Sequence, residues 1–330
     1  MMNCTQLSVD EGLVHSLTLS GSGAIQPAGS SDESANSWMH FDANNPAVAA
    51  WLADGGGLNA IAVGALTSEE TRPRVLRRGD NLIITLRGVN RIRDATGDDD
   101  DPSEDMVSLR IWTNGTRILS ARLRQLHATE RLVRELHSGD GASSIPELLV
   151  DWIEYIVDDM ADTMTRLEDD VISAESNIDQ GDPVITRQAI IALRKRALML
   201  RRHMAPQREA LTRLSNETPS WLEEYHRVRI RDINDRLIRY IEDLDQIRDR
   251  AILAQEELAA RLADEMNRKT YVFTLVAVLF LPLGFLTGLL GVNIGGLPGI
   301  DEPRAFSYLM AFCLVISVAL LGYFKWRRWL

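Results

Sequence analysis

The sequence lacks the short motifs around which many enzyme active sites are built. It contains no glycine-rich phosphate loop, no nucleophile elbow and no HExxH helix. Cysteine is scarce, and its two examples, Cys4 and Cys313, are far apart, so neither a disulfide framework nor a CxxC metal site is expected. These absences argue against an enzyme, and no resident cofactor is expected.

Histidine is also scarce and is not grouped. A zinc site in a protein needs several converging histidine, cysteine or carboxylate ligands. His203 and His226 lie on predicted long helices, and neither has a histidine or cysteine three or four residues further on. We expect a surface or packing role for both, as for His127 and His137. The position of any protein-bound metal is therefore unknown from the sequence.

Basic residues are outnumbered by acidic ones, 36 to 47, which gives a formal net charge of −11. Residues 271–330 hold four of the basic and two of the acidic residues, so the preceding residues carry a net charge of −13. This balance disfavours nucleic acid as a partner, because nucleic-acid binding rests on basic contacts to phosphate. An acidic domain suits the accumulation of cations, although a solvated acidic surface is the commoner explanation of such a composition.

Charge is absent from residues 271–290, and again from residues 305–324. A helix rises about 1.5 Å per residue, so each run spans roughly the 30 Å hydrocarbon core of a bilayer. We predict a transmembrane hairpin in residues 271–330, in contact with membrane lipid. The N-terminus lacks an apolar segment of the kind found in signal peptides, so none is expected.

Flanking charges predict the orientation of this hairpin. Arg268 and Lys269 precede the first span, and Lys325, Arg327 and Arg328 follow the second. Basic residues concentrate on the cytoplasmic side of membrane proteins, so both termini are expected in the cytoplasm.

The first span has one face of mostly small residues at helical spacing. This stripe has two interpretations: close helix packing, as in small-xxx-small pairs, or the wall of a pore with room for water. Thr287 is a further candidate for lining such a pore. The stripe consists of Thr270, Thr274, Ala277, Leu281, Gly284, Gly288 and Gly291.

Residues 1–140 are predicted to form a cytosolic α/β domain on a mostly antiparallel sheet, which makes the whole chain an α+β protein. Residues 81–89 and 106–113 are strand-like, and residues 13–19 alternate as an edge strand does. Asn114-Gly115 connects residues 106–113 to residues 116–121 and is a strong signal for a two-residue hairpin.

Residues 141–270 are predicted to form a cytosolic helical stalk. Its second helix, from Pro183, is expected to kink or end at Pro206. A third helix, beginning at Trp221, continues directly into the first span. Its apolar residues recur at steps of four and three, which is typical of a coiled-coil seam, and continue at steps of four toward the membrane: Ile233, Leu237, Tyr240, Leu244, Ile247, Ala251, Ala254 and Leu258, then Leu262 and Met266.

The segment GVNIGGLPG at residues 291–299 resembles the GxN signature of the CorA superfamily of two-span metal-ion transporters. Valine at the middle position, followed by IGG-x-PG, looks like the zinc-transporter branch of that family, ZntB. TRPRV at residues 71–75 and MAPQR at residues 204–208 agree with it. The resemblance covers essentially the whole chain.

This resemblance implies a homopentamer in the bacterial inner membrane, in which five stalks line a funnel leading to a pore. It also implies zinc as cargo, with cadmium, nickel and cobalt as related ions, and uptake coupled to protons. Direction and coupling are not indicated by composition. The spans contain no carboxylate or histidine on which a proton relay is readily placed.

The same resemblance implies that Gly291, Val292 and Asn293 form the selectivity motif. An asparagine ring offers carbonyl oxygens to a hydrated cation without fixing a charge. The alternative is that Asn293 and Gly291 only cap a helix end. Asp301 and Glu302, in the loop between the spans, are candidates for attracting cations to the outer mouth.

We therefore predict a transporter of divalent metal, zinc above all. One alternative is a magnesium or cobalt channel of the same superfamily. Another is a scaffold whose hairpin only tethers a cytosolic coiled coil, which would need no asymmetry between the faces of the first span.

Overall fold

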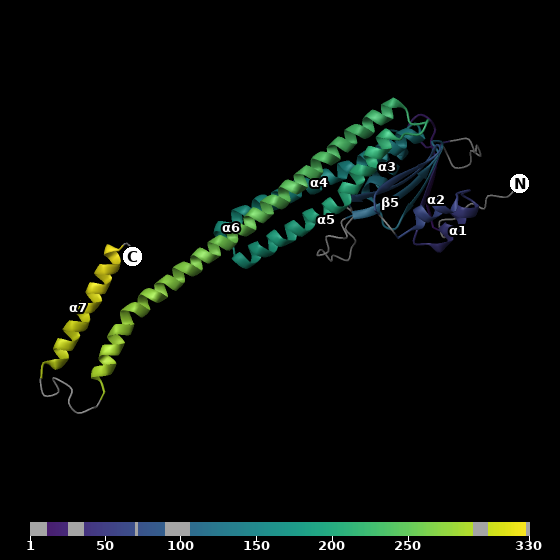
Figure 1. Cartoon of the computed structure of the whole chain (residues 1–330). Coiled ribbons are helices and arrows are strands. Elements are labelled where there is room, and N and C mark those ends of the chain that lie inside the picture. The colour runs from purple at the N-terminus through teal and green to yellow at the C-terminus, as the bar shows by residue number, and fades with distance from the viewer. Residues whose placement is uncertain (1–11, 26–35, 70–71, 90–105, 293–302, 328–330) are drawn as a thin grey trace. The chain divides into compact units, whose positions relative to one another are not determined.

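The structure is a computed structural model that describes residues 12–25, 36–69, 72–89, 106–292 and 303–327 (Figure 1). The chain divides into two units, Met1–Gln255 and Glu256–Leu330. The boundaries at residues 140 and 270 that the sequence suggests remain predictions.

A six-stranded sheet lies in the first unit, in the order β1-β2-β6-β5-β4-β3. Only β2 and β6 pair in parallel, and the other neighbours are antiparallel, as predicted. β1 is an edge strand, also as predicted. The strands are β1 (Leu13–Thr18), β2 (Ser37–Asp42), β3 (Arg74–Arg78), β4 (Asn81–Val89), β5 (Met106–Thr113) and β6 (Arg117–Arg122).

The hairpin predicted at Asn114-Gly115 joins β5 to β6, but three residues, 114–116, connect the strands instead of the predicted two. Gly115 has a φ of +88°, a conformation that side chains with a Cβ rarely adopt. A Cβ there would also meet the ring of Trp221 at 2.4 Å. Trp221 precedes α6 (Glu224–Leu290), and its indole N–H donates to the carbonyl of Asp80 in the β3–β4 turn at 2.7 Å. Two turns of the sheet therefore hold the chain where it enters α6.

Two short helices, α1 (Pro46–Asp54) and α2 (Ala60–Thr67), cover one face of the sheet (Figure 1). Asparagine caps both: the side chain of Asn45 accepts from the N–H of Ala47, and that of Asn59 accepts from the N–H of Ala62. Their apolar residues pack on alternate strand residues in one cluster, which includes Phe41, Val48, Leu52, Leu66, Ile83, Trp112 and Leu119.

Trp38, on the opposite face of β2 from Phe41, packs against Trp152 of α4 (Ile145–Gln180) with ring centroids 4.8 Å apart. Both indoles are fully buried, and their N–H groups donate to Ser120 and Thr129. Replacing a buried tryptophan by alanine costs about 3–5 kcal/mol, so this pair is a major part of the contact between sheet and helices. The remaining helices are α3 (His127–Ser138), α4 (Ile145–Gln180), α5 (Pro183–Asn216), α6 (Glu224–Leu290) and α7 (Ala305–Trp326).

α5 does not end at Pro206, contrary to one of the two outcomes predicted there, but continues to Asn216. Proline removes one N–H donor, which leaves only the carbonyl of residue 202 without its helical partner. Packing on both sides of Pro206 outweighs this loss, because Met204 and Gln207 are fully buried. The side-chain oxygen of Gln207 also accepts the N–H of Arg87 on β4 at 2.8 Å.

The predicted seam of α6 packs inside the chain itself. Of its residues, Leu244 is 1% exposed and Leu258 is 3% exposed, whereas Leu262 and Met266 are 40% and 65% exposed. The seam from Ile233 to Ala254 therefore belongs to the core of the first unit. The apolar contact that the coiled-coil spacing predicts is thus made, over this range, within a single chain.

Candidate functional site

The stripe of small residues lies on α6 in the second unit, on a helix that is continuous from Glu224 to Leu290. An added Cβ at Gly284 or Gly288 would meet no atom within 4 Å. Leu281, the one large member of the stripe, is 73% exposed. This face is therefore open along its C-terminal half in a single chain.

The threonine hydroxyls near the stripe are turned to the backbone of their own helix. Thr274 donates to the carbonyl of Thr270 at 2.9 Å, and Thr287 donates to that of Leu283 at 2.9 Å. Each hydroxyl hydrogen is thus occupied, and the oxygen keeps acceptor lone pairs. Such oxygens suit the outward-pointing hydrogens of a cation's hydration water. Thr287 precedes Gly291 by four residues, so it continues the stripe at its end.

Pro282 lies within α6, and the helix continues through it. Because proline has no N–H, the carbonyl of Val278 lacks its usual partner four residues on. In a bilayer such a carbonyl needs a neighbouring group or water.

The helix ends at the predicted motif. The N–H of Gly291 donates to the carbonyl of Thr287 at 2.9 Å, and a Cβ on Gly291 would lie 3.0 Å from that same oxygen. Val292 follows and is 44% exposed. Asn293, Asp301 and Glu302 lie outside the described residues, so the roles suggested for them remain predictions.

Both predicted spans are helices long and apolar enough to cross a membrane, within α6 and α7. The core helix of a soluble protein passes the same test but is mostly buried. Here no part of either apolar window is buried in the described structure. Their position in the last fifth of the chain also differs from that of a signal sequence.

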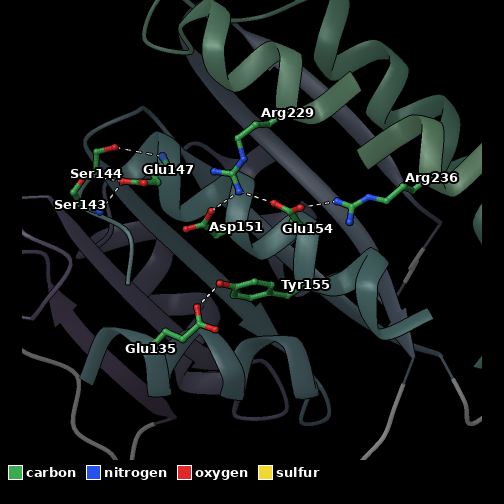
Figure 2. A network of polar contacts seen from close by, with 9 residues as sticks. All are labelled: Glu135, Ser143, Ser144, Glu147, Asp151, Glu154, Tyr155, Arg229 and Arg236. Carbon is green, nitrogen blue, oxygen red and sulfur yellow. Dashed lines mark hydrogen bonds and ion pairs between the residues drawn. The ribbon is translucent and has the colours of Figure 1, made fainter. Parts of the chain in front are cut away.

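Upstream in the first unit, two arginines of α6 are paired with acids of α4 (Figure 2). Arg229 donates to Asp151 at 2.7 Å and to Glu154 at 2.5 Å. Arg236 donates to the other oxygen of Glu154 at 2.6 Å and to Asp158 at 2.8 Å. Glu154 therefore bridges two arginines that are two helical turns apart.

These pairs alter the acidity of their members. Burial disfavours the charged form of Glu154, but hydrogen bonds from Arg229 and Arg236 outweigh it and lower the pKa of Glu154. At Asp151, burial dominates and raises the pKa although Arg229 opposes it. Burial would lower the pKa of Arg229, but its bonds to Glu154 and Asp151 raise it.

The same helices carry a further contact nearer the end of the first unit. Arg250 of α6 forms a two-bond contact with Glu175 of α4, at 2.9 and 2.5 Å. Arg201 of α5 pairs with Asp245 of α6 at 2.7 Å. This series of ion pairs was not predicted from the sequence. Its signal was present, because Arg229, Arg236 and Arg250 are separated by multiples of seven residues.

Within the part of the chain that the structure describes, no three or more histidine, cysteine, aspartate or glutamate residues form a group able to hold a metal. Three of the histidines considered above contact other groups. His127 contacts Asp159, His137 contacts the carbonyl of Val133, and His203 contacts Arg87. These contacts agree with the surface or packing roles expected for them, and His137 is the exposed one of the three.

The chain matches the family described as CorA-like Mg2+ transporter protein over residues 33–327. The chain belongs to this CorA-like family. The match includes the sheet, the long helices and both spans, so it covers every element except β1.

Individual relatives agree with this assignment. The chain is 35% identical over 319 residues to the zinc transport protein ZntB of Yersinia enterocolitica, covering 96% of this chain and 94% of that protein. Among solved structures, full-length CmaX is 32% identical with a TM-score of 0.80, covering 97% of this chain and 98% of that one. The CorA magnesium transporter of Methanocaldococcus jannaschii has the same TM-score at 18% identity, covering 94% and 98%, and supports the fold alone.

Proposed function

We propose that this CorA-like protein transports divalent metal, with zinc as its main cargo, across the bacterial inner membrane. The proposal rests most directly on the first span. Its open face of small residues and acceptor oxygens ends at Gly291 and is carried by α6, which also contributes to the core of the first unit. A simple anchor needs none of these features.

Zinc is favoured over magnesium by the ZntB relative named above. The chain is 35% identical over nearly its full length to a protein named for zinc transport. Its GVN motif, with valine at the middle position, belongs with that branch. Cadmium, nickel and cobalt, which resemble zinc in size and ligand preference, are proposed as secondary cargo.

The proposed pathway passes a hydrated ion along one face of α6. Zinc prefers nitrogen, sulfur and carboxylate ligands, and the spans offer only Cys313 among these. An ion that keeps its water needs acceptors for water hydrogens, which the oxygens of Thr274 and Thr287 supply. Asn293 is proposed as the polar ring at the mouth, beside Gly291 and Val292, with Asp301 and Glu302 attracting cations from outside.

A pore of this kind needs several copies of the chain around one axis, and we propose a homopentamer. The exposed apolar side chains of the spans and of the adjoining part of α6 provide surface for contact between copies and with lipid. They include Leu262, Met266, Phe273, Phe280, Phe285 and Phe306. Both termini are proposed to be cytoplasmic, with residues 1–140 as the α/β domain, 141–270 as the stalk and 271–330 as the membrane hairpin. Coupling to a proton gradient is part of the proposal.

A magnesium channel is the second candidate, because the family itself is described by magnesium. The two cargoes differ in how readily they lose water, since Mg2+ dehydrates reluctantly. A pathway for hydrated ions discriminates between them only modestly.

One flux experiment separates these functions. The purified full-length protein is placed in liposomes, and entry of radioactive zinc is followed with and without an inward proton gradient. Zinc entry that is not suppressed by excess magnesium supports the zinc transporter. If excess magnesium suppresses the entry of radioactive zinc as strongly as excess unlabelled zinc does, the result supports the magnesium channel. Flux equal to that of empty liposomes for every ion, by correctly assembled protein, supports the tethered scaffold and contradicts the proposal.

A further inference from the structure

Arg110, in the middle of β5, is a buried arginine with most of its donors unused. Its side chain is 1% exposed. Nη2 donates to the carbonyl of Ser68, just beyond α2, at 2.7 Å, whereas Nε and Nη1 have no hydrogen-bond partner. Among the residues that the structure describes, no carboxylate forms an ion pair with it. A buried charge left in this way is costly unless something compensates it.

Thr85 of β4 is the direct cross-strand partner of Arg110. Directly opposed residues share one face of a sheet, so the hydroxyl lies on the same side as the guanidinium. Thr85 is also 1% exposed, and its Oγ1 has no hydrogen-bond partner. Two buried residues that are paired across neighbouring strands thus have hydrogen-bond donors that are not used by the protein.

The surroundings of this pair are basic. Arg87 follows Thr85 on the same face of β4, and its Nη1 is 3.0 Å from Nε2 of His203 on α5. Burial and the charge of Arg87 both lower the pKa of Arg110. Burial, Arg87 and Arg202 lower the pKa of His203 to about 4, so this histidine adds no charge near neutral pH. The positive charge of the site comes from arginine alone.

We propose that Arg110 and Thr85 form a binding site for a small oxyanion of the phosphate type. Such an anion has several acceptor oxygens and can receive Nε–H, Nη1–H and the threonine hydroxyl together, while neutralising the buried charge. The simpler interpretation is that Arg110 only caps the C-terminus of α2 through Ser68. That role uses Nη2 alone and gives no function to Nε, Nη1 or Thr85. The inference concerns the α/β part of the chain and is independent of transport.

The test measures the thermal unfolding midpoint of the purified full-length protein in phosphate, sulfate and chloride at equal ionic strength. We expect phosphate and sulfate to raise the midpoint above its value in chloride. In Thr85→Val and in Arg110→Met the apparent dissociation constant for phosphate should rise by about tenfold or more, the effect of losing a hydrogen bond to a charged group. Arg78→Gln removes an exposed charge from β3 in the same sheet and should keep the full response.

Thr85→Val also distinguishes lost binding from damaged folding. Because the hydroxyl is buried without a partner, replacing it by a methyl group should leave the midpoint in chloride unchanged or raised. A clear fall in chloride would show that the hydroxyl has a partner within the protein and would overturn the site. An equal phosphate response in wild type and both variants, or no response in wild type beyond that of chloride, would also overturn it.

Discussion

Arg229 of α6 lies between two acids of α4, with Nη2 2.7 Å from Asp151 and 2.5 Å from Glu154. Glu154 also accepts from Arg236, seven residues further along α6. One carboxylate therefore fixes the register between the helix that packs on the sheet and the helix that continues into the membrane span. In the proposed transporter this contact holds the cytosolic end of α6 in place.

Replacing Glu154 by glutamine should destabilise the chain by about 1–2 kcal/mol, because two partly buried arginines lose their shared charged acceptor. The pKa of Glu154 is lowered in the folded chain, so its contribution is complete above the ordinary glutamate pKa of about 4.3 and is lost as pH falls through the folded value. The difference between wild type and variant should therefore shrink below about pH 4. Urea unfolding at pH 7 and pH 3.5 measures both effects.

Glu209→Gln is the matched control, since Glu209 is exposed on α5. It should change stability by less than about 0.5 kcal/mol. If Glu154→Gln is no less stable than this control at pH 7, the contact between α4 and α6 does not contribute to the stability of the chain.

Leu244→Asp should unfold or severely weaken the first unit itself. Leu244 is 1% exposed within a single chain, and an unpaired charge at such a position costs about 3–5 kcal/mol. Leu253→Asp lies on the same helix, but Leu253 is 64% exposed, so helix content and midpoint should stay near those of wild type. Circular dichroism of the two full-length variants checks this. Equal midpoints would mean that Leu244 is not in the core.

His203→Gln should make stability less sensitive to acid. The pKa of His203 is lowered to about 4, whereas an unfolded histidine titrates near 6.5, so the unfolded chain binds more protons between these values. Wild-type stability therefore falls as pH is lowered from about 6.5 to about 4, and His203 contributes one part of that slope. The variant lacks this part. Unfolding midpoints at half-unit pH steps measure the slope, and identical slopes would show that His203 titrates normally in the folded chain.

Much of the fold follows from local patterns. The spacing of apolar residues predicted the long helices and both spans, and Asn114-Gly115 predicted the β5–β6 hairpin, where Gly115 adopts the expected positive φ. β3 was not predicted, because Arg74–Arg78 has three exposed residues of five and little alternation. Charged, short edge strands avoid unwanted pairing, and the same feature hides them from a search for apolar alternation.

Long-range relationships were harder to predict. The spacing of Leu244 and its neighbours shows that α6 has an apolar face but does not show whether the covering residues come from the same chain. Arg110 and Thr85 appear in the sequence as ordinary polar strand residues. Only the register between β4 and β5, and the cover given by α2, place them together and bury them.

A cysteine at Ile300, in a chain whose Cys4 and Cys313 are replaced, should react with an impermeant thiol reagent added to intact cells. The basic residues flanking both spans predict that the loop between them lies outside the cytoplasm. Ser176→Cys, exposed on α4, should react only after lysis. The reverse pattern for the two positions would contradict the proposed orientation.

Asn293→Ala and Gly291→Val should fail in different ways. Removing the amide of Asn293 from each subunit takes a ring of neutral acceptors from the proposed mouth but adds no bulk. We expect correct insertion, a normal oligomeric mass and a zinc flux reduced by at least about tenfold, the effect of roughly 1.4 kcal/mol on a barrier. Valine at position 291 instead introduces a Cβ 3.0 Å from the carbonyl of Thr287, with two methyl groups beyond it, so assembly should suffer as well.

Gly284→Ala tests the open face itself, because a Cβ at Gly284 meets no atom within 4 Å of its own chain. Its effect reports contact with another subunit or with the ion path, since its own chain leaves room. Light scattering in detergent gives the oligomeric mass, and zinc entry into liposomes gives the flux. If Asn293→Ala carries zinc like wild type while Gly291→Val misassembles, the motif only terminates the helix. Selectivity would then have to reside at Thr287, at Gly288 or in the cytosolic part of the path.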